Sequence, residues 1–159
     1  MEHALQMELA LQDEFAPNGV CFGCGPANEH GLQLRSFVRG DKLVAVFHPE
    51  GHHQAFPGVL NGGIIGSLLD CHCLWAAAWA LMQSRRASKP PCTVTASYAV
   101  ELKRPTPMDA ELVLEAWVLS VEGDRATIAG TLSAGDKVCA TCHGTFVAVT
   151  LGHPAYHGW

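Results

Sequence analysis

Positive charge is scarce in this sequence. Lys and Arg contribute 10 of the 159 residues against 15 Asp and Glu, for a formal net charge of -5. The densest basic sites are two pairs, Arg85 with Arg86 and Lys103 with Arg104. A protein that binds nucleic acid needs a clustered basic surface to neutralise phosphates. We therefore expect no nucleic-acid partner.

The first 15 residues lack the basic start and central apolar run of a secretory signal. Their sequence, MEHALQMELALQDEF, predicts instead a short amphipathic helix. Its apolar contacts are either Leu5, Leu9 and Phe15 or Ala4, Leu9 and Leu11. We therefore expect a cytoplasmic location, where thiols stay reduced. The 7 cysteines are an odd number, so they cannot all pair within one chain.

What the sequence does have is one long apolar stretch, VLNGGIIGSLLDCHCLWAAAWALM, at residues 59–82. Its length suffices to span a membrane, but Asp70 would then lie near the bilayer centre at a cost of about 2.5–3.5 kcal/mol. A helix that is apolar all round is otherwise buried on most sides. We expect no membrane span, and a core helix that ends near Arg85 and Arg86, before Pro90.

The other predicted elements are β-strands. A hairpin is predicted before the helix, and about four strands, joined mostly by hairpins, follow it. The runs are 32–49 before the helix and 92–105, 110–134 and 136–150 after it. The fold class is therefore α+β, with an antiparallel sheet that curls around one apolar helix. We expect one domain over residues 1–159, with an N-terminal helix and loop extension at 1–31 and a peripheral tail at 150–159.

Three motifs resemble those of a known family. Residues 21–32, CFGCGPANEHGL, form an N-terminal signature, and residues 53–70, HQAFPGVLNGGIIGSLLD, form a loop and helix start. Residues 103–107, KRPTP, resemble a strand end. Together they are similar to the hotdog-fold acyl-CoA thioesterases, in the branch similar to the phenylacetate-pathway thioesterase. The resemblance covers roughly residues 20–149, and Asn61 stands where the family usually has His.

The resemblance implies a hotdog fold, with a curled sheet wrapped around one central helix. It also implies hydrolysis of acyl-CoA, with coenzyme A as part of the substrate and no further cofactor, and a dimer or dimer of dimers with sites at the subunit interface. The amide of Asn61 can donate a hydrogen bond but cannot shuttle a proton near neutral pH. A hotdog protein that only binds acyl-CoA or another lipid, and a hydratase, remain alternatives.

The residues themselves suggest how the chemistry is divided. A helix that begins at Gly62 and Gly63 offers free N–H groups to a developing oxyanion, and glycine lets the backbone approach the thioester. Asp70 can attack the carbonyl or activate a water. Eight residues separate Gly62 from Asp70, about 12 Å along a helix. We therefore expect Gly62 of one subunit to act with Asp70 of another.

Supporting roles fall to residues of the preceding loop, the helix and the next strand. Gln54 is a candidate to hold the attacking water or the carbonyl, with His53 as its competitor. The resemblance places Thr95 near the carboxylate. Gly66 lies four residues before Asp70, on the same helical face, and is expected to make room for substrate or a partner helix.

Charged and aromatic residues near these candidates have two interpretations each. Lys103 and Arg104 can meet the phosphates of coenzyme A, or can be solvated charges at a strand end. His72 is expected to be a hydrogen-bonded core or interface residue, because it points away from the Asp70 face. Trp75 and Trp79 are expected to belong to the core.

Two cysteine patterns suggest metals. Residues 139–143, CATCH, fit a haem-attachment pattern but lie in a predicted strand. Cys21 and Cys24 form one Cys-x-x-Cys pair and Cys139 and Cys142 another, and four thiolates can close a zinc site. Residues 139 and 142 point to opposite faces of a strand, which is poor chelating geometry. We therefore expect no metal.

Overall fold

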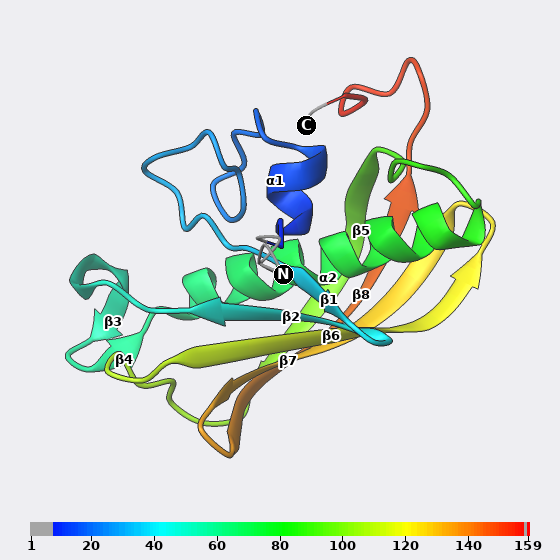
Figure 1. Cartoon of the computed structure of the whole chain (residues 1–159). Helices are drawn as coiled ribbons and strands as arrows, with labels where there is room; N and C mark the ends of the chain where they lie inside the picture. The colour runs from blue at the N-terminus through cyan, green and yellow to red at the C-terminus, as the bar shows by residue number, and fades with distance from the viewer. Residues whose placement is uncertain (1–7, 158) are drawn as a thin grey trace, which may run out of the picture.

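A computed structural model of the chain describes residues 8–157 and 159, and shows one sheet curled around one long helix (Figure 1). The sheet has six antiparallel strands in the order β1-β2-β6-β7-β8-β5, and β3 and β4 pair separately. This confirms the predicted α+β hotdog arrangement. The elements are α1 (Leu11–Phe15), β1 (Phe37–Arg39), β2 (Lys42–Phe47), β3 (Gln54–Phe56), β4 (Val59–Leu60), α2 (Gly62–Ser84), β5 (Thr93–Leu102), β6 (Leu112–Glu122), β7 (Arg125–Ala134) and β8 (Lys137–Ala148).

The long helix α2 begins and ends where the sequence predicts. The side chain of Asn61 caps its start by accepting a hydrogen bond from the Ile64 N–H at 3.1 Å. At its end, Arg85 is the C-cap and Arg86 takes a left-handed conformation with φ of 51°. That backbone conformation stops the helix, and Pro90 follows before β5 begins.

Helix α2 lies against the concave side of the sheet, where β5, β6, β7 and β8 all contact it. Gly130 on β7 permits this close approach, because a Cβ there would lie 2.7 Å from the Cys73 sulfur. By length and composition α2 is also a candidate membrane span, but 67% of its most apolar 18-residue window is buried inside the fold. Burial of this kind is typical of a core helix and makes the evidence for a span weak.

The prediction that His72 is a hydrogen-bonded core or interface residue is confirmed for the core. Its imidazole is completely buried, with Nδ1 2.8 Å from the Ser36 hydroxyl and Nε2 2.9 Å from the Leu43 carbonyl. Burial lowers the pKa of His72 to about 4. The neutral ring thus joins α2 to the segment that precedes and includes β2. Trp75 is also in the core, at 2% exposure.

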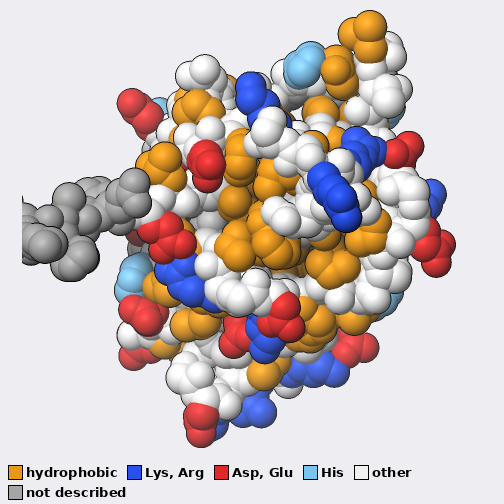
Figure 2. Space-filling view, turned by 45° about the vertical axis from the view of Figure 1, so that its right-hand side comes forward, with side chains coloured by type: hydrophobic (Ala, Val, Ile, Leu, Met, Phe, Trp, Pro, Cys, Tyr) orange, Lys and Arg blue, Asp and Glu red, His pale blue; other side chains and the backbone are white. Residues whose placement is uncertain are grey.

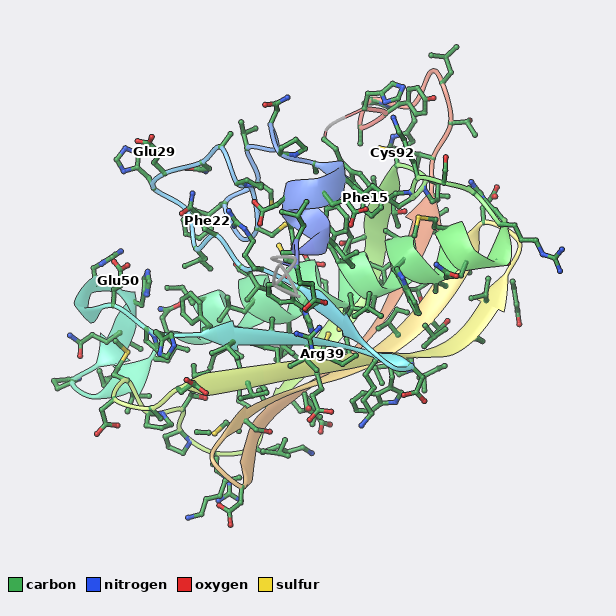
Figure 3. The ribbon with its side chains drawn as sticks, in the orientation of Figure 1. Phe15, Phe22, Glu29, Arg39, Glu50 and Cys92 are labelled. Carbon is green, nitrogen blue, oxygen red and sulfur yellow. The ribbon has the colours of Figure 1, made fainter. Side chains whose placement is uncertain are left out.

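The N-terminal segment differs from the prediction. The helix α1 has only five residues, and Leu9, expected to be a buried contact, is 59% exposed. Ala4 and Leu5 lie outside the described residues. Leu11 is buried, and Phe15 packs against the core from the side of α1 that faces α2 (Figure 3). Figure 2 shows apolar side chains gathered on the face where α1 and α2 meet.

Two further features were not predicted. The loop before α2 contains the short pair β3 and β4, which have three and two residues and carry no apolar alternation. The C-terminal segment contributes Trp159, which stacks on Trp75 with ring centroids 4.6 Å apart. The last residue of the chain thus packs against α2 rather than lying apart from the core.

Candidate active site

The central feature of the site is a carboxylate held by one hydroxyl. Asp70 is half-buried on α2, and the Thr95 hydroxyl on β5 donates a hydrogen bond of 2.7 Å to its Oδ1. Burial raises the pKa of the Asp70 carboxyl, and the hydrogen bond from Thr95 opposes that rise. The structure therefore brings together the two residues that were expected to be neighbours.

One face of α2 follows β5 from the helix start to Asp70. A Cβ on Gly62 would lie 3.4 Å from Leu102, and one on Gly66 would lie 3.9 Å from the Tyr98 hydroxyl oxygen. Helix and strand run in opposite directions, so the early turns of α2 meet the end of β5. All of these positions lie at the edge of the six-stranded sheet, since β5 is its last strand.

The start of α2 leaves backbone donors available. The first four N–H groups of a helix have no partner within it. Asn61 takes those of Ile64 through its side chain and Ile65 through its carbonyl. Among the described residues, none accepts a hydrogen bond from the N–H groups of Gly62 and Gly63. Asn61 is thus seen as a helix cap, and the two glycines present the free donors.

The loop before α2 lies beside the helix start, because the Asn61 N–H donates to the His53 carbonyl at 2.9 Å. The Gln54 amide donates to the Gly51 carbonyl and accepts from the Gly58 N–H, so both of its ends are engaged inside this loop. His53 is buried, and its Nδ1 accepts from the Glu50 N–H at 2.9 Å. Both side chains therefore shape the loop.

The basic pair Lys103 and Arg104 follows directly after Leu102, at the end of β5 near the helix start. Both side chains are exposed, and Lys103 forms an ion pair with Glu101. The helix start near these residues is about two turns of α2 away from Asp70. The structure therefore gathers the candidates into two groups, one at the helix start and one around Asp70.

A cavity of about 220 Å³ opens beside Asp70. Apolar side chains from three parts of the chain line much of it: Leu74 and Trp75 on α2, Val94 on β5, and Trp159 at the C-terminus. An apolar cavity with one carboxylate at its wall is suited to hold an acyl group next to a reactive centre. Sequence reasoning missed the contribution of Trp159, because nothing local connects it to residues some 80 positions earlier.

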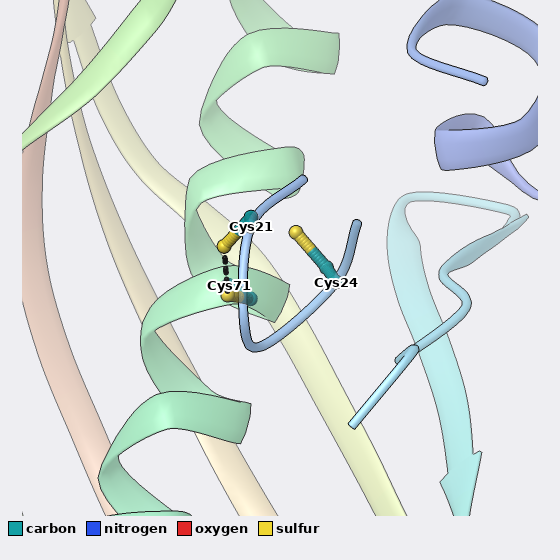
Figure 4. Close-up of side chains that lie close together, drawn as sticks. All are labelled: Cys21, Cys24 and Cys71. Carbon is teal, nitrogen blue, oxygen red and sulfur yellow. Dashed lines mark hydrogen bonds between the residues drawn. The ribbon is translucent and has the colours of Figure 1, made fainter. Parts of the chain in front are cut away.

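Sequence reasoning also missed a cysteine cluster on the same cavity. The ligand atoms of Cys21, Cys24 and Cys71 all lie within 4.8 Å of one another (Figure 4). Cys139 and Cys142, the pair considered with Cys21 and Cys24, lie on β8 and do not join this group. The available signal was Cys71 itself, which directly follows Asp70 in the apolar helix.

A comparison of this sequence with models of known protein families agrees with the motifs and with the geometry of the site. The model of the thioesterase superfamily matches residues 57–142, which include α2, Asp70 and Thr95 and more than half of the chain. The chain belongs to the thioesterase superfamily. Membership supports thioester hydrolysis as the general class of activity. A comparison with curated proteins gave no match.

Solved structures of the thioesterase superfamily share this fold. A thioesterase superfamily protein from Shewanella loihica is 34% identical, with a TM-score of 0.64 over 79% of this chain and 98% of that one. The thioesterase superfamily protein RHA08564 is 27% identical, with a TM-score of 0.67 over 91% and 70%. The PaaI protein of the Escherichia coli phenylacetic acid degradation operon is 15% identical, with a TM-score of 0.63 over 75% and 81%, and shows the fold alone.

Proposed function

We propose that the protein hydrolyses acyl-CoA thioesters to a free acid and coenzyme A, with Asp70 as general base or nucleophile. The observation that carries this proposal is the position of Asp70. Its carboxylate stands on an apolar helix, is oriented by Thr95, and lies at the wall of an apolar cavity. A carboxylate so placed either activates a water or attacks the thioester carbonyl itself.

The second part of the reaction is stabilisation of the oxyanion. The free N–H groups of Gly62 and Gly63 and the positive end of the α2 dipole are suited to this task. Because Gly62 and Asp70 lie about 12 Å apart along α2, they cannot both reach one carbonyl carbon within a single subunit. The proposed reaction therefore uses Gly62 of the partner subunit.

The outer edge of β5 supports a dimer. This ten-residue strand ends the sheet, and Tyr98 and Leu102 on it are 46% and 58% exposed. A long exposed edge strand is suited to pair with a second copy. Antiparallel pairing about a two-fold axis near its middle brings the Thr95 end of one strand beside the Leu102 end of the other. Gly62 of the partner subunit, which lies at that Leu102 end, thereby approaches Asp70.

The remaining candidates fit the two halves of the substrate. The 220 Å³ cavity beside Asp70 is suited to the acyl group. Lys103 and Arg104, at the helix-start end of β5, are suited to the phosphates of coenzyme A. We propose that the protein acts in the cytoplasm as a dimer or a dimer of dimers. We also propose that the hydrolysis needs no cofactor, because side chains and backbone N–H groups of the protein supply the reactive groups.

A thiol-release assay tests the activity. The purified protein is incubated with a panel of short, long, branched and aromatic acyl-CoAs, and free coenzyme A is detected with a thiol reagent. We expect release from at least one class at a rate that is proportional to the enzyme concentration. Binding of acyl-CoA by calorimetry, with no release from any member of the panel, contradicts the proposal and identifies the protein as a binding module.

Thr95 is expected to act by positioning Asp70. Thr95→Val removes the hydroxyl without changing the shape of the side chain, and we expect kcat to fall about 10-fold, because a hydrogen bond to a charged group contributes roughly 1.5 kcal/mol. Steady-state kinetics on the best acyl-CoA measure the effect. Thr95→Ser is the matched control and keeps the wild-type kcat; equal losses in both variants contradict the role of the hydroxyl.

A further inference from the structure

Three cysteines from two separate segments meet beside the cavity. Cys21 and Cys24 lie in the loop between α1 and β1, and Cys71 lies on α2 (Figure 4). The sulfurs of Cys21 and Cys71 are 3.7 Å apart, and all three lie within 4.8 Å of one another. Cys24 and Cys71 are buried, whereas Cys21 is exposed. Such a group of thiols has the composition of a metal site.

The distance between the cysteine sulfurs can be compared with the distances in a disulfide, a zinc site and an iron–sulfur cluster. A disulfide requires sulfurs about 2.05 Å apart. Around a tetrahedral zinc ion with Zn–S bonds of about 2.3 Å, two sulfurs lie about 3.8 Å apart. The 3.7 Å between the sulfurs of Cys21 and Cys71 is close to this spacing, and it is also the length of a hydrogen-bond contact between two reduced thiols. In a [4Fe–4S] cluster each cysteine binds a different iron, which would hold the sulfurs farther apart than in this compact group.

The backbone of the loop is built for this close approach. A Cβ on Gly23 would lie 2.4 Å from the Cys71 sulfur, so only glycine lets the loop rest on α2 at this point. The Gly25 N–H donates to the Cys21 carbonyl at 2.8 Å and closes the turn that carries both cysteines. The Leu32 N–H also donates to the Phe22 carbonyl, at 2.7 Å. These contacts hold the turn that carries Cys21 and Cys24 against α2 at Cys71.

We propose that Cys21, Cys24 and Cys71 bind one Zn²⁺ as three thiolates, with a water molecule as the fourth ligand. All three cysteines line the 220 Å³ cavity, through which that water has access. Binding releases the remaining thiol protons to solvent and joins the loop to α2 next to Asp70. This site replaces the expectation of no metal, which considered the cysteine pairs of the sequence and not Cys71. The zinc site is inferred independently of the proposed hydrolysis, although the zinc-bound water would lie in the cavity assigned above to the acyl group.

Metal analysis of protein purified without oxygen and loaded with zinc tests the site. We expect about one zinc ion per chain in the wild type, and less than about a tenth of that in Cys21→Ser, Cys24→Ser and Cys71→Ser. Cys92→Ser is the matched control and keeps its zinc. Cys92 lies beside the C-terminal segment, where its thiol donates to the Ala155 carbonyl (Figure 3). Circular dichroism of each variant shows whether the fold is kept.

A spectroscopic measurement on the wild type makes the test independent of the variants. Cobalt-loaded protein is expected to show thiolate-to-metal charge transfer and the intense visible bands of tetrahedral coordination. X-ray absorption on the zinc form is expected to show three sulfurs at about 2.3 Å and one oxygen. The proposal is overturned if the wild type binds no zinc, if folded Cys71→Ser keeps it, or if thiol titration of metal-free protein finds two fewer thiols than the 7 of the sequence, which indicates a disulfide.

Discussion

Asp70→Asn is expected to lower kcat for acyl-CoA hydrolysis by about 10²–10⁴-fold. An amide is neither a base at neutral pH nor a nucleophile toward a thioester, so the group that attacks or activates water is lost. The Asn carbonyl oxygen can still accept the hydrogen bond from Thr95, which Asp70 accepts at 2.7 Å. The fold and the cavity are therefore expected to remain, and KM to change little.

The effect of Asp70→Asn is measured by thiol release with the acyl-CoA that gives the fastest wild-type rate. Calorimetry with a thioether analogue of that substrate shows whether binding is retained. Asp136→Asn, an exposed carboxylate in the turn between β7 and β8, is the matched control and keeps the wild-type kcat. A wild-type rate in Asp70→Asn would falsify the role of Asp70 as base or nucleophile, while leaving the thioesterase activity itself in place.

A mixed dimer of two inactive variants is expected to regain about half of the wild-type activity. The two variants are Asp70→Asn and Gly62→Pro, and each alone is expected to lose activity by about 10²-fold or more. In the mixed dimer, one of the two sites combines Asp70 from one subunit with Gly62 from the other, and both residues are intact there. The other site lacks both groups. A site formed within one subunit gives no active combination, since each subunit then carries one defect.

The variant Gly62→Pro removes one of the two proposed oxyanion donors, leaves the Gly63 N–H in place, and changes little else. Gly62 is the first residue of α2, a position that favours proline, because its N–H has no partner in the helix. The preceding Asn61 is already extended, at φ of -61° and ψ of 132°, as a residue before proline prefers. A Cβ at Gly62 would meet Leu102 at 3.4 Å, an ordinary contact. We therefore expect α2 to form normally.

The mixed dimer is isolated with two different affinity tags, and its thiol release is compared with that of the wild type and of each variant alone. Gly62→Ala, which keeps the N–H, is the matched control and is expected to remain active. Light scattering establishes the oligomeric state of every sample. An inactive mixed dimer, or a wild-type protein that is active as a stable monomer, contradicts a site shared between subunits.

Much of the fold was predictable because its signals are local. The helix α2 is visible as a continuous apolar run that begins at Gly62 and Gly63 and ends before the prolines at 90 and 91, and these features act within a few residues of the helix ends. The turns before β2, between β6 and β7, and before β8 follow from Gly40, Gly123 and Gly135, which all take positive φ. His72 was placed in the core because it points away from Asp70 on the helix.

The features that were predicted wrongly or missed have a common physical cause: each of them depends on tertiary contacts. The helix α1 is shorter than its apolar pattern indicates, because burial of Leu11 and exposure of Leu9 are decided by how the segment meets α2 and β1. The strands β3 and β4 are too short to carry a pattern. The stacking of Trp159 on Trp75 depends on where the end of β8 leaves the C-terminus.

By itself the sequence determined which chemistry is present: one carboxylate, Asp70, in an apolar helix that starts with two glycines. It also determined the separation of Gly62 and Asp70, because helix geometry converts eight residues into about 12 Å. Only the tertiary structure decided that Thr95 holds Asp70, that this face of α2 follows an open sheet edge, and that Cys71 meets Cys21 and Cys24. Those contacts join residues 25 to 50 positions apart, and the packing of the sheet and the loop on α2 sets them.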